Sequence, residues 1–244
     1  LYRPSSEYFR SGYQQLADTY SNSNINFIEE GSFKNDISRI LTGINYKNTM
    51  CLVDDIIFTR AINLDIFTDV DLDKYVPSLR LGKNLARSYT RQQPQVKPQL
   101  LKYSTQDNSH QPLFKWTWLD GQFDWGYPCS LDGNILLTEE LKIMIDVLEF
   151  NAPNTLERSM QWFLTHYQNR SGLCFEKSVL VNIPFTRVQS EADNVSASMS
   201  SEYLQSLWNA IKSILNPTRK LTIPVPIKST HYMSSYANRL SRQP

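Results

Sequence analysis

The sequence lacks the features that would place it in several common classes of protein. Three cysteines occur in 244 residues, Cys51, Cys129 and Cys174, and none belongs to a CxxC pair. This argues against a disulfide framework or a cysteine-based zinc site. No uninterrupted apolar run reaches about 18 residues, so no transmembrane helix is expected. We therefore expect a protein of a reducing, cytoplasmic compartment.

Excess charge of either sign is also lacking. The 25 Lys and Arg residues nearly balance the 24 Asp and Glu residues, which leaves a formal net charge of +1. Such a chain has no overall field to draw it onto nucleic acid, and no nucleic-acid partner is expected. The tail carries Arg239 and Arg242, which leave peripheral contact with a membrane surface open. Other partners are expected to be recognised at a local site.

Several motifs that define well-known sites are missing. The sequence has no G-x-G-x-x-G dinucleotide fingerprint, no P-loop, no G-x-S-x-G nucleophile elbow and no HExxH zinc motif. Chemistry in this protein must therefore come from a less standard arrangement of side chains.

What the sequence does contain is enough apolar material for one α/β domain. Hydrophobic residues make up 41% and aromatic residues 12% of the chain, which suits a core in a domain of this size. Strand and helix patterns alternate, which predicts a mixed, mostly parallel sheet flanked by helices. Helices are predicted at residues 13–20, 32–44, 138–150, 154–168 and 200–215, and strands at 24–30, 49–58, 76–82, 114–120 and within 174–189.

The pair Asp54 and Asp55 is the first candidate site. It follows the apolar residues of the predicted strand 49–58, a pattern typical of a strand buried on both faces. Ligands of parallel sheets bind beyond the carboxyl ends of the strands, and two carboxylates there can hold Mn²⁺ or Mg²⁺. The alternative is a solvated turn. Because neighbouring strand residues point to opposite faces, metal-independent chemistry also stays open.

Two isolated acids are candidates for proton transfer. Asp132 lies in SLDG and Glu157 in PNTLE. A carboxylate that removes a proton from a hydroxyl group is a common general base. The alternatives are a tight-turn aspartate for Asp132 and a first-turn helix acid for Glu157.

A late histidine and a cluster of aromatic residues complete the candidates. His231, in KSTHY, can complete a metal site begun by earlier carboxylates, although a lone histidine is more often structural. Trp125 and Tyr127 lie in a segment rich in aromatic residues and can stack on a sugar ring, with core packing as the alternative.

Taken in order, these segments resemble a known family. The sequence reads YRPSSEYFRSGYQQL, FIEEGSFKNDI, CLVDDIIFTRAINLD, SLRLGKN, WGYPCSLDGNIL, NAPNTLE and KSTHY. It is similar to nucleotide-sugar-dependent glycosyltransferases of the GT-A type, as found in bacteria and viruses. The resemblance covers most of residues 2–232 and implies a single domain over 1–244. Within it, residues 1–85 would bind the donor and residues 113–232 the acceptor. Such folds begin with a further strand and helix, so an N-terminal strand is expected to precede Leu1.

The resemblance also implies roles for individual residues. Asp55 would be the principal metal or phosphate ligand, with His231 assisting, and Asp54 would contact the ribose or sugar. Asp132 would lie at the sugar or acceptor and Glu157 near the acceptor, as the base. The remaining implied contacts are Arg3, Ser5, Ser6, Arg80 and Gly82 to the donor, and Trp125 and Tyr127 to the acceptor.

The implied activity is transfer of a sugar from a nucleotide-sugar donor to a glycan or lipid-linked acceptor, as in polysaccharide biosynthesis, with Mn²⁺ or Mg²⁺ as cofactor. Two alternatives stay open. One is a non-catalytic carbohydrate-binding protein with this fold. The other is a glycoside hydrolase that uses Asp132 and Glu157 as its carboxyl pair.

Overall fold

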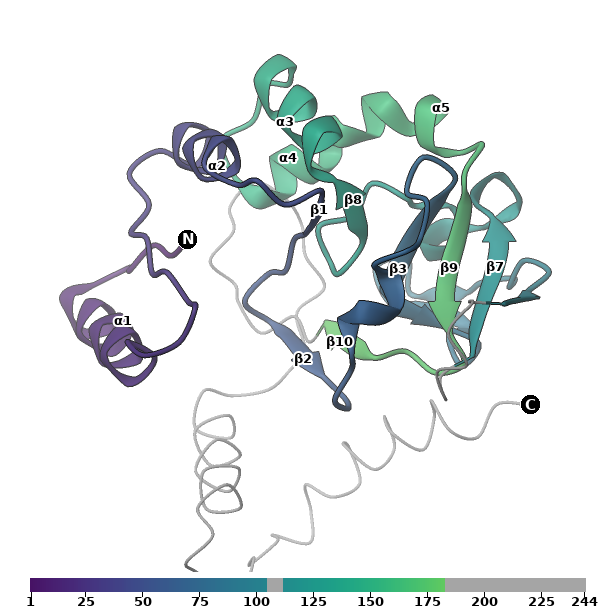
Figure 1. Ribbon diagram of the computed structural model, residues 1–244, viewed down its shortest axis with the longest axis horizontal. Coiled ribbons are helices and arrows are strands. Elements are labelled where there is room, and N and C mark those ends of the chain that lie inside the picture. Colours follow the sequence, from purple (N-terminus) through teal and green to yellow (C-terminus); the bar gives the residue numbers. More distant parts are fainter. Residues whose placement is uncertain (105–111, 183–244) are drawn as a thin grey trace, which may run out of the picture.

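The computed structural model describes residues 1–104 and 112–182 (Figure 1). The predicted helix at 200–215, His231, Arg239 and Arg242 lie outside the described residues. Within the described ranges, no helix combines the length and the apolar character that crossing a membrane requires.

The largest sheet has four strands in the order β3-β9-β7-β6. β3 (Tyr75–Gly82) pairs in parallel with β9 (Ser171–Phe175). β7 (Leu113–Thr117) is antiparallel to β9 and to β6 (Leu101–Tyr103). The mixed α/β class is therefore confirmed. The expectation of a mostly parallel sheet is wrong for the described strands, because β7 runs against both of its neighbours.

Three further strand pairs are all antiparallel. β1 (Asn48–Met50) pairs with β8 (Ile135–Leu137), and β2 (Ile56–Phe58) pairs with β10 (Leu180–Asn182). A short ribbon joins β4 (Arg87–Ser88) to β5 (Gln93–Pro94). The strand predicted at 49–58 is thus broken between β1 and β2. Leu52, in the break, is 43% exposed, so this apolar run is not buried on both faces.

The helices follow the apolar periodicity of the sequence more closely. α2 (Phe33–Thr42) and α3 (Thr138–Val147) confirm the predictions at 32–44 and 138–150. The segment 154–168 divides into α4 (Pro153–Met160), a 3-10 turn (Gln161–Phe163) and α5 (Leu164–Tyr167). Other 3-10 turns occupy Leu64–Phe67, Trp118–Asp120 and Phe123–Gly126.

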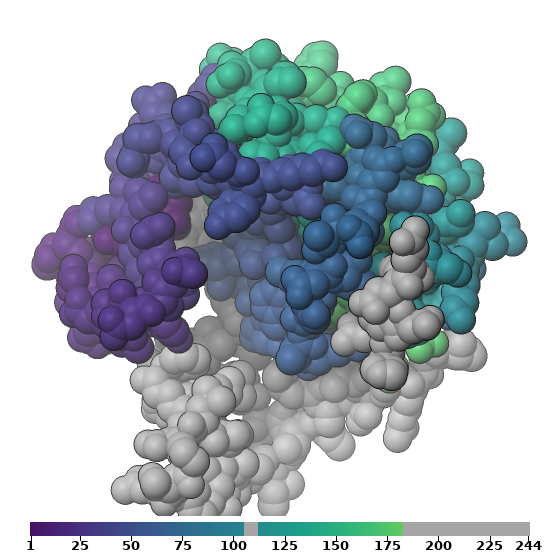
Figure 2. Space-filling model, in the orientation of Figure 1, coloured from purple at the N-terminus to yellow at the C-terminus, as the bar shows by residue number. Residues whose placement is uncertain are grey.

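The N-terminal segment differs from the rest in its burial. α1 (Glu7–Thr19) begins earlier than the helix predicted at 13–20 and has no buried residue. In place of the strand predicted at 24–30, Glu29 forms an isolated parallel bridge with Tyr2. Figures 1 and 2 show α1 as a projection at one side of the molecule, on the same side as α2 and away from α3 to α5.

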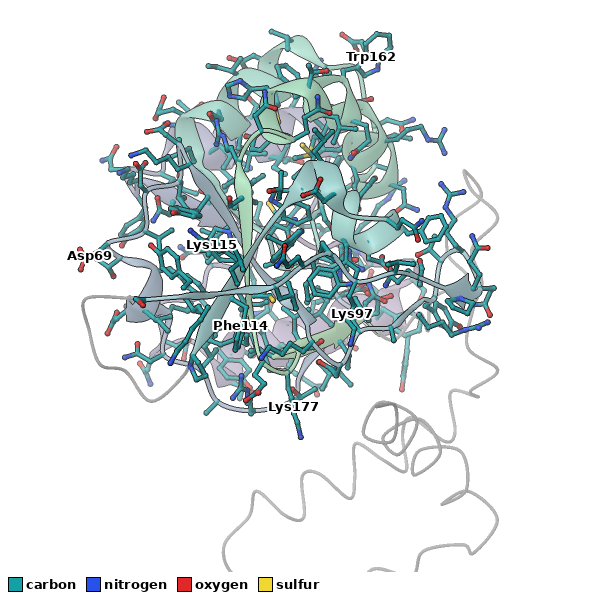
Figure 3. The ribbon with its side chains drawn as sticks, turned by 90° about the vertical axis from the view of Figure 1, so that its right-hand side faces the viewer. Asp69, Lys97, Phe114, Lys115, Trp162 and Lys177 are labelled. Atoms are coloured by element: carbon teal, nitrogen blue, oxygen red, sulfur yellow. The ribbon has the colours of Figure 1, made fainter. Side chains whose placement is uncertain are left out.

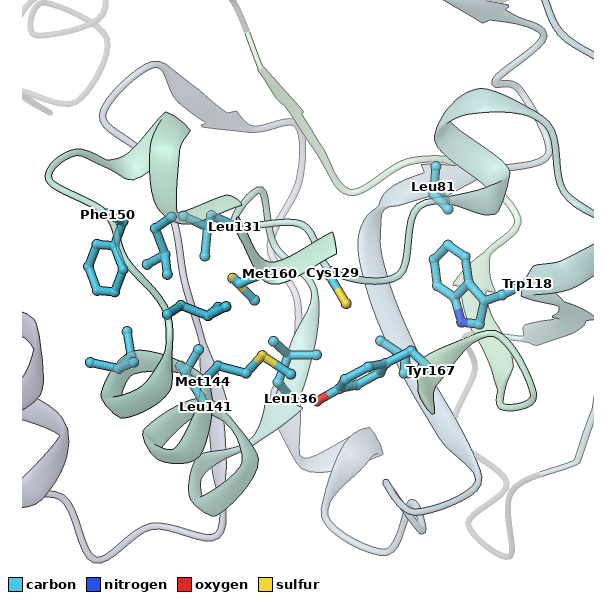
Figure 4. Close-up of a cluster of buried hydrophobic side chains, with 14 of the residues drawn as sticks. Leu81, Trp118, Cys129, Leu131, Leu136, Leu141, Met144, Phe150, Met160 and Tyr167 are labelled. Atoms are coloured by element: carbon cyan, nitrogen blue, oxygen red, sulfur yellow. The ribbon is translucent and has the colours of Figure 1, made fainter. Parts of the chain in front are cut away.

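The main core lies between the helices α2 to α4 and the sheet. Leu141, Met144 and Met160 meet side chains from the sheet and from the segment before β8 (Figure 4). Three tryptophans extend this core: Trp116 contacts Trp118 and Trp125 in edge-to-face geometry, with ring centroids 4.7 and 5.0 Å apart. Each large buried aromatic side chain contributes apolar area on the order of 150–250 Å².

Candidate functional site

Three predicted acids, Asp55, Asp132 and Glu157, come together although they are far apart in the chain. Asp55 lies in the turn between β1 and β2, Asp132 precedes β8, and Glu157 is on α4. Burial, followed by the negative charge of Asp132, raises the pKa of both Asp55 and Glu157. Asp132 is therefore the middle member of one coupled group, which we call the carboxyl cluster.

Backbone contacts hold the loops of the carboxyl cluster against each other. Gly133 donates its N–H to the carbonyl oxygen of Cys51 at 3.0 Å. Gly133 has φ of 81°, a left-handed conformation that favours glycine. Asn134 then donates from its side chain to the carbonyl oxygen of Pro128 at 2.8 Å. These two hydrogen bonds, together with the turn at Gly133, place Asp132 beside the segment that carries Asp55.

Arg80 is the cation of the site. It extends from β3 and donates from Nη1 to Asp124 Oδ1 at 2.8 Å. Its positive charge also lowers the pKa of Asp132 and Glu157 against the effect of burial. The Nε atom of Arg80 is buried and has no hydrogen-bond partner in the described part of the chain. The guanidinium group of Arg80 thus pairs with Asp124 and interacts electrostatically with Asp132 and Glu157.

The environment of the carboxyl cluster raises the pKa values of its acids toward neutral pH. Burial, followed by the charge of Asp132, raises the pKa of Glu157 to about 7. Burial, followed by the charges of Asp132 and Asp54, raises the pKa of Asp55 to about 6. Burial also raises the pKa of Asp132. Near neutral pH, Glu157 can therefore both accept and release a proton, as a general base or acid requires.

Tyr127, predicted at the acceptor, lies beside the carboxyl cluster. Burial raises the pKa of its hydroxyl group, and the charge of Glu157 raises it further. The phenol therefore stays protonated at neutral pH and can donate a hydrogen bond to a ligand.

Asn182, the last residue of β10, is a member of the site that sequence reasoning missed. Its side-chain amide lies 3.5 Å from Asp132 Oδ2, and its hydrogen bonds offset part of the burial that raises the pKa of Asp132 and of Asp55. The signal in the sequence was a polar residue at the end of the apolar run SVLVN. It carried no indication of which acids the residue would reach.

The two adjacent aspartates differ in burial, although they lie in a turn, where strand alternation does not apply. Asp55 is partly buried, whereas Asp54 is exposed. The charge of Asp54 acts on Tyr13 of α1, whose pKa is raised chiefly by burial. Asp54 therefore lies between the carboxyl cluster and the N-terminal projection.

Other predicted contacts lie apart from the carboxyl cluster in the described structure. Arg3 pairs with Glu30 at 3.5 Å and its side chain is 77% exposed. Ser5 and Ser6 are exposed just before α1. Gly82 packs closely against the backbone of Ser178, where a Cβ atom would lie 2.2 Å from the amide nitrogen.

The predicted role of Trp125 at the acceptor is wrong. Its side chain is 0% exposed, and its Nε1 donates to the carbonyl oxygen of Leu85 at 3.1 Å. The predicted stacking on a sugar is not available to a fully buried ring. The alternative, core packing beside Trp116, describes its position.

One member of the carboxyl cluster, Asp55, can supply a hard oxygen donor to a divalent cation. Among the described residues, no three Asp, Glu, His or Cys side chains are grouped as a ready metal site. However, Asp55 Oδ1 is buried and has no hydrogen-bond partner among those residues. Carboxylate oxygen is the ligand type that Mg²⁺ and Mn²⁺ prefer, with substrate phosphates and water completing the shell. Asp55 therefore fits a cation that arrives with a phosphate ligand.

Comparisons with known proteins add no assignment. The chain matches no protein-family model, no curated protein and no solved structure. The function must therefore be inferred from the chemistry of the carboxyl cluster and its surroundings.

Proposed function

We propose that this protein transfers a sugar from a nucleotide-sugar donor to a hydroxyl group of a glycan or lipid-linked acceptor. The observation that supports the proposal is the electrostatic coupling of Asp55, Asp132 and Glu157 beside Arg80. The resemblance of the VDDI, SLRLG, SLDG and PNTLE segments to GT-A enzymes points to the same chemistry.

In this proposal Glu157 is the proton acceptor. The acceptor hydroxyl oxygen forms a bond to the anomeric carbon while the bond from that carbon to the phosphate oxygen breaks. The electron pair of the broken bond leaves with the nucleoside diphosphate, and the hydroxyl proton passes to Glu157. A carboxylate with a pKa near the working pH is well suited to this transfer.

Asp55 is proposed to face the diphosphate. A divalent cation held there would supply positive charge to the leaving group. Arg80 offers a second positive charge near the same acids, and Asp132, between Asp55 and Glu157, would contact the sugar. Asn182 would hold Asp132 and Asp55 in place through its amide group.

A second candidate is hydrolysis of a glycosidic bond by Asp132 and Glu157. The coupled pair motivates it, because an acid with a pKa of about 7 beside a second carboxyl group also suits a glycosidase. Hydrolysis of an oligosaccharide without any nucleotide sugar, abolished by Glu157→Gln, would favour this candidate over transfer.

The transferase proposal is tested by calorimetric titration with UDP, GDP, dTDP and CMP, each with and without Mn²⁺. We expect saturable binding of one nucleotide that Mn²⁺ strengthens. Asp55→Asn should weaken that binding at least about tenfold, which corresponds to about 1.4 kcal/mol.

The matched control is Asp146→Asn, the same change at an exposed position on α3. It should bind like the unmodified protein. Failure of the folded protein to bind any of the nucleotides, or equal binding by Asp55→Asn, would contradict the proposal. Glycan binding without nucleotide binding would favour a non-catalytic carbohydrate-binding protein.

A further inference from the structure

The positive charges of this nearly neutral chain are unevenly distributed. From residue 75 to 117, the described residues include no Asp or Glu, whereas the whole chain has 24 acids. This interval runs from β3 to β7 and covers β4, β5 and β6. Its basic residues are Arg80, Lys83, Arg87, Arg91, Lys97, Lys102 and Lys115.

Two of these lysines lie beside one aromatic ring, and a third contacts the backbone of one of them. The Nζ atom of Lys83 lies 3.3 Å from the centroid of Phe114. Lys102 is the cross-strand partner of Phe114, so their side chains share a face of the sheet. Lys97 donates from Nζ to the carbonyl oxygen of Lys83 at 3.0 Å. Figure 3 looks onto this side of the molecule and shows Lys97 near Phe114.

Little negative charge offsets this group. Glu176 lies 3.7 Å from Lys83 and its side chain is 62% exposed. No other described ion pair involves Lys83, Lys97 or Lys102. Like charges brought together repel each other, so an anionic partner would relieve this repulsion.

Exposed apolar side chains lie in the same segment. Val96 is 68% exposed and directly precedes Lys97, and Leu101 is 50% exposed and directly precedes Lys102. β6 is the outer strand of the described four-stranded sheet. In β6, Leu101 lies opposite Lys115 and Lys102 lies opposite Phe114, so these two side chains are on opposite faces of the sheet. Residues 96–102 therefore offer cations and apolar groups on both sides of this outer strand, and a partner would meet them edge-on.

We propose that residues 96–102, together with Lys83, form a docking surface for an anionic lipid bilayer. Lysines attract the phosphates of anionic headgroups, and exposed aliphatic side chains enter the boundary between headgroups and acyl chains. A purely charged polymer would use the lysines alone and leave Val96 and Leu101 in water. The combination favours a bilayer.

A chain of hydrogen bonds connects this surface to Arg80, the cation beside the carboxyl cluster. Gln95, the residue before Val96, is bonded to Asp124 in both directions, at 3.0 and 3.1 Å, and Asp124 pairs with Arg80. Docking at residues 96–102 would therefore bring the candidate site close to the membrane surface. The docking proposal does not depend on sugar transfer.

The test is flotation of the whole protein with vesicles of phosphatidylcholine, with and without phosphatidylglycerol. We expect binding to the anionic vesicles that decreases as salt is added. The double variant Lys97→Gln/Lys102→Gln should lower the partition coefficient about fivefold for each lysine removed. Val96→Ser should weaken binding at high salt, where attraction between charges is screened.

The matched control is Lys47→Gln/Lys74→Gln, which removes the same charge at exposed positions. Lys74 directly precedes β3 and Lys83 directly follows it, so the control lies at the other end of that strand. Absence of binding to anionic vesicles would overturn the proposal, as would equal losses in the two double variants. Binding to heparin but not to vesicles would instead assign the surface to an acidic polysaccharide.

Discussion

Glu157 combines burial with a neighbouring negative charge, and both oppose its ionisation. It receives hydrogen bonds from the Ser130 side chain and the Leu131 backbone, which offset these effects only in part. Its pKa lies near 7 against an ordinary value of 4.5. Such a group reduces the stability of the folded protein when it is charged, which is typical of a residue retained for chemistry.

We therefore predict that Glu157→Gln stabilises the protein at alkaline pH. The folded state binds more protons than the unfolded state between pH 4.5 and about 7. The contribution of Glu157 to stability consequently falls as the pH rises through this window. At about pH 8 the variant should gain about 3 kcal/mol in free energy of unfolding, because each pKa unit corresponds to about 1.4 kcal/mol.

Urea unfolding at several pH values measures this effect. The gain should vanish below about pH 4.5, where Glu157 is neutral in both states. Glu149→Gln, at a side chain that is 94% exposed, should change stability by no more than about 0.5 kcal/mol. A Glu157→Gln variant that is no more stable than the parent at alkaline pH would show that the carboxylate is not destabilised by its surroundings.

At the scale of secondary-structure elements, a buried ion pair joins helices to the sheet. Arg170 donates from Nη1 and Nη2 to the two oxygens of Glu140 on α3, at 3.0 and 2.5 Å, and also to the carbonyl oxygen of Leu72 at 2.8 Å. Tyr167 of α5 donates to the same carboxylate at 2.6 Å. Burial raises the pKa of Glu140, but these hydrogen bonds outweigh it and the pKa is lowered.

Arg170→Met should destabilise the protein strongly. It keeps an unbranched apolar stem but leaves the partly buried Glu140 carboxylate without its cation, a change that costs about 3–5 kcal/mol. Arg39→Met removes an exposed i,i+3 partner of Asp36 and should cost no more than about 0.5 kcal/mol. Urea unfolding at neutral pH gives both values. Similar losses of unfolding free energy in the two variants would show that the Arg170–Glu140 pair stabilises the protein no more than an exposed ion pair does.

Elements with regular periodicity were predictable from sequence, and elements defined by distant partners were not. Phe33, Ile37 and Leu41 repeat at helical spacing, and α2 forms where that pattern lies. The apolar run at 49–53 does not indicate which strand it will pair with. Only its first residues belong to a strand, β1, and the partner of β1 is β8, some 85 residues away along the chain. Strand pairing of this kind depends on tertiary contacts that local composition does not encode.

At the scale of the whole molecule, four distant segments supply one site. The residue patterns nominated Asp55, Asp132 and Glu157, since carboxylates at a strand end, in a turn and in the first turn of a helix have recognisable contexts, whereas Arg80 was implied only by the family resemblance. It placed Trp125 at the acceptor, but a tryptophan in an aromatic-rich segment looks the same whether it lies in the core or in a pocket. Burial is set by the packing of all segments together, so the sequence could nominate this residue but not locate it.

The most direct test of the carboxyl cluster is a titration of the Glu157 side-chain carboxyl carbon by NMR, in the parent protein and in Asp132→Asn. The coupling predicts a midpoint near 7 in the parent and a lower midpoint once the charge of Asp132 is removed, although burial still holds the pKa of Glu157 above 4.5. Asp146→Asn, on α3, should leave the midpoint unchanged. A parent midpoint near 4.5, with no response to Asp132→Asn, would contradict a single coupled site.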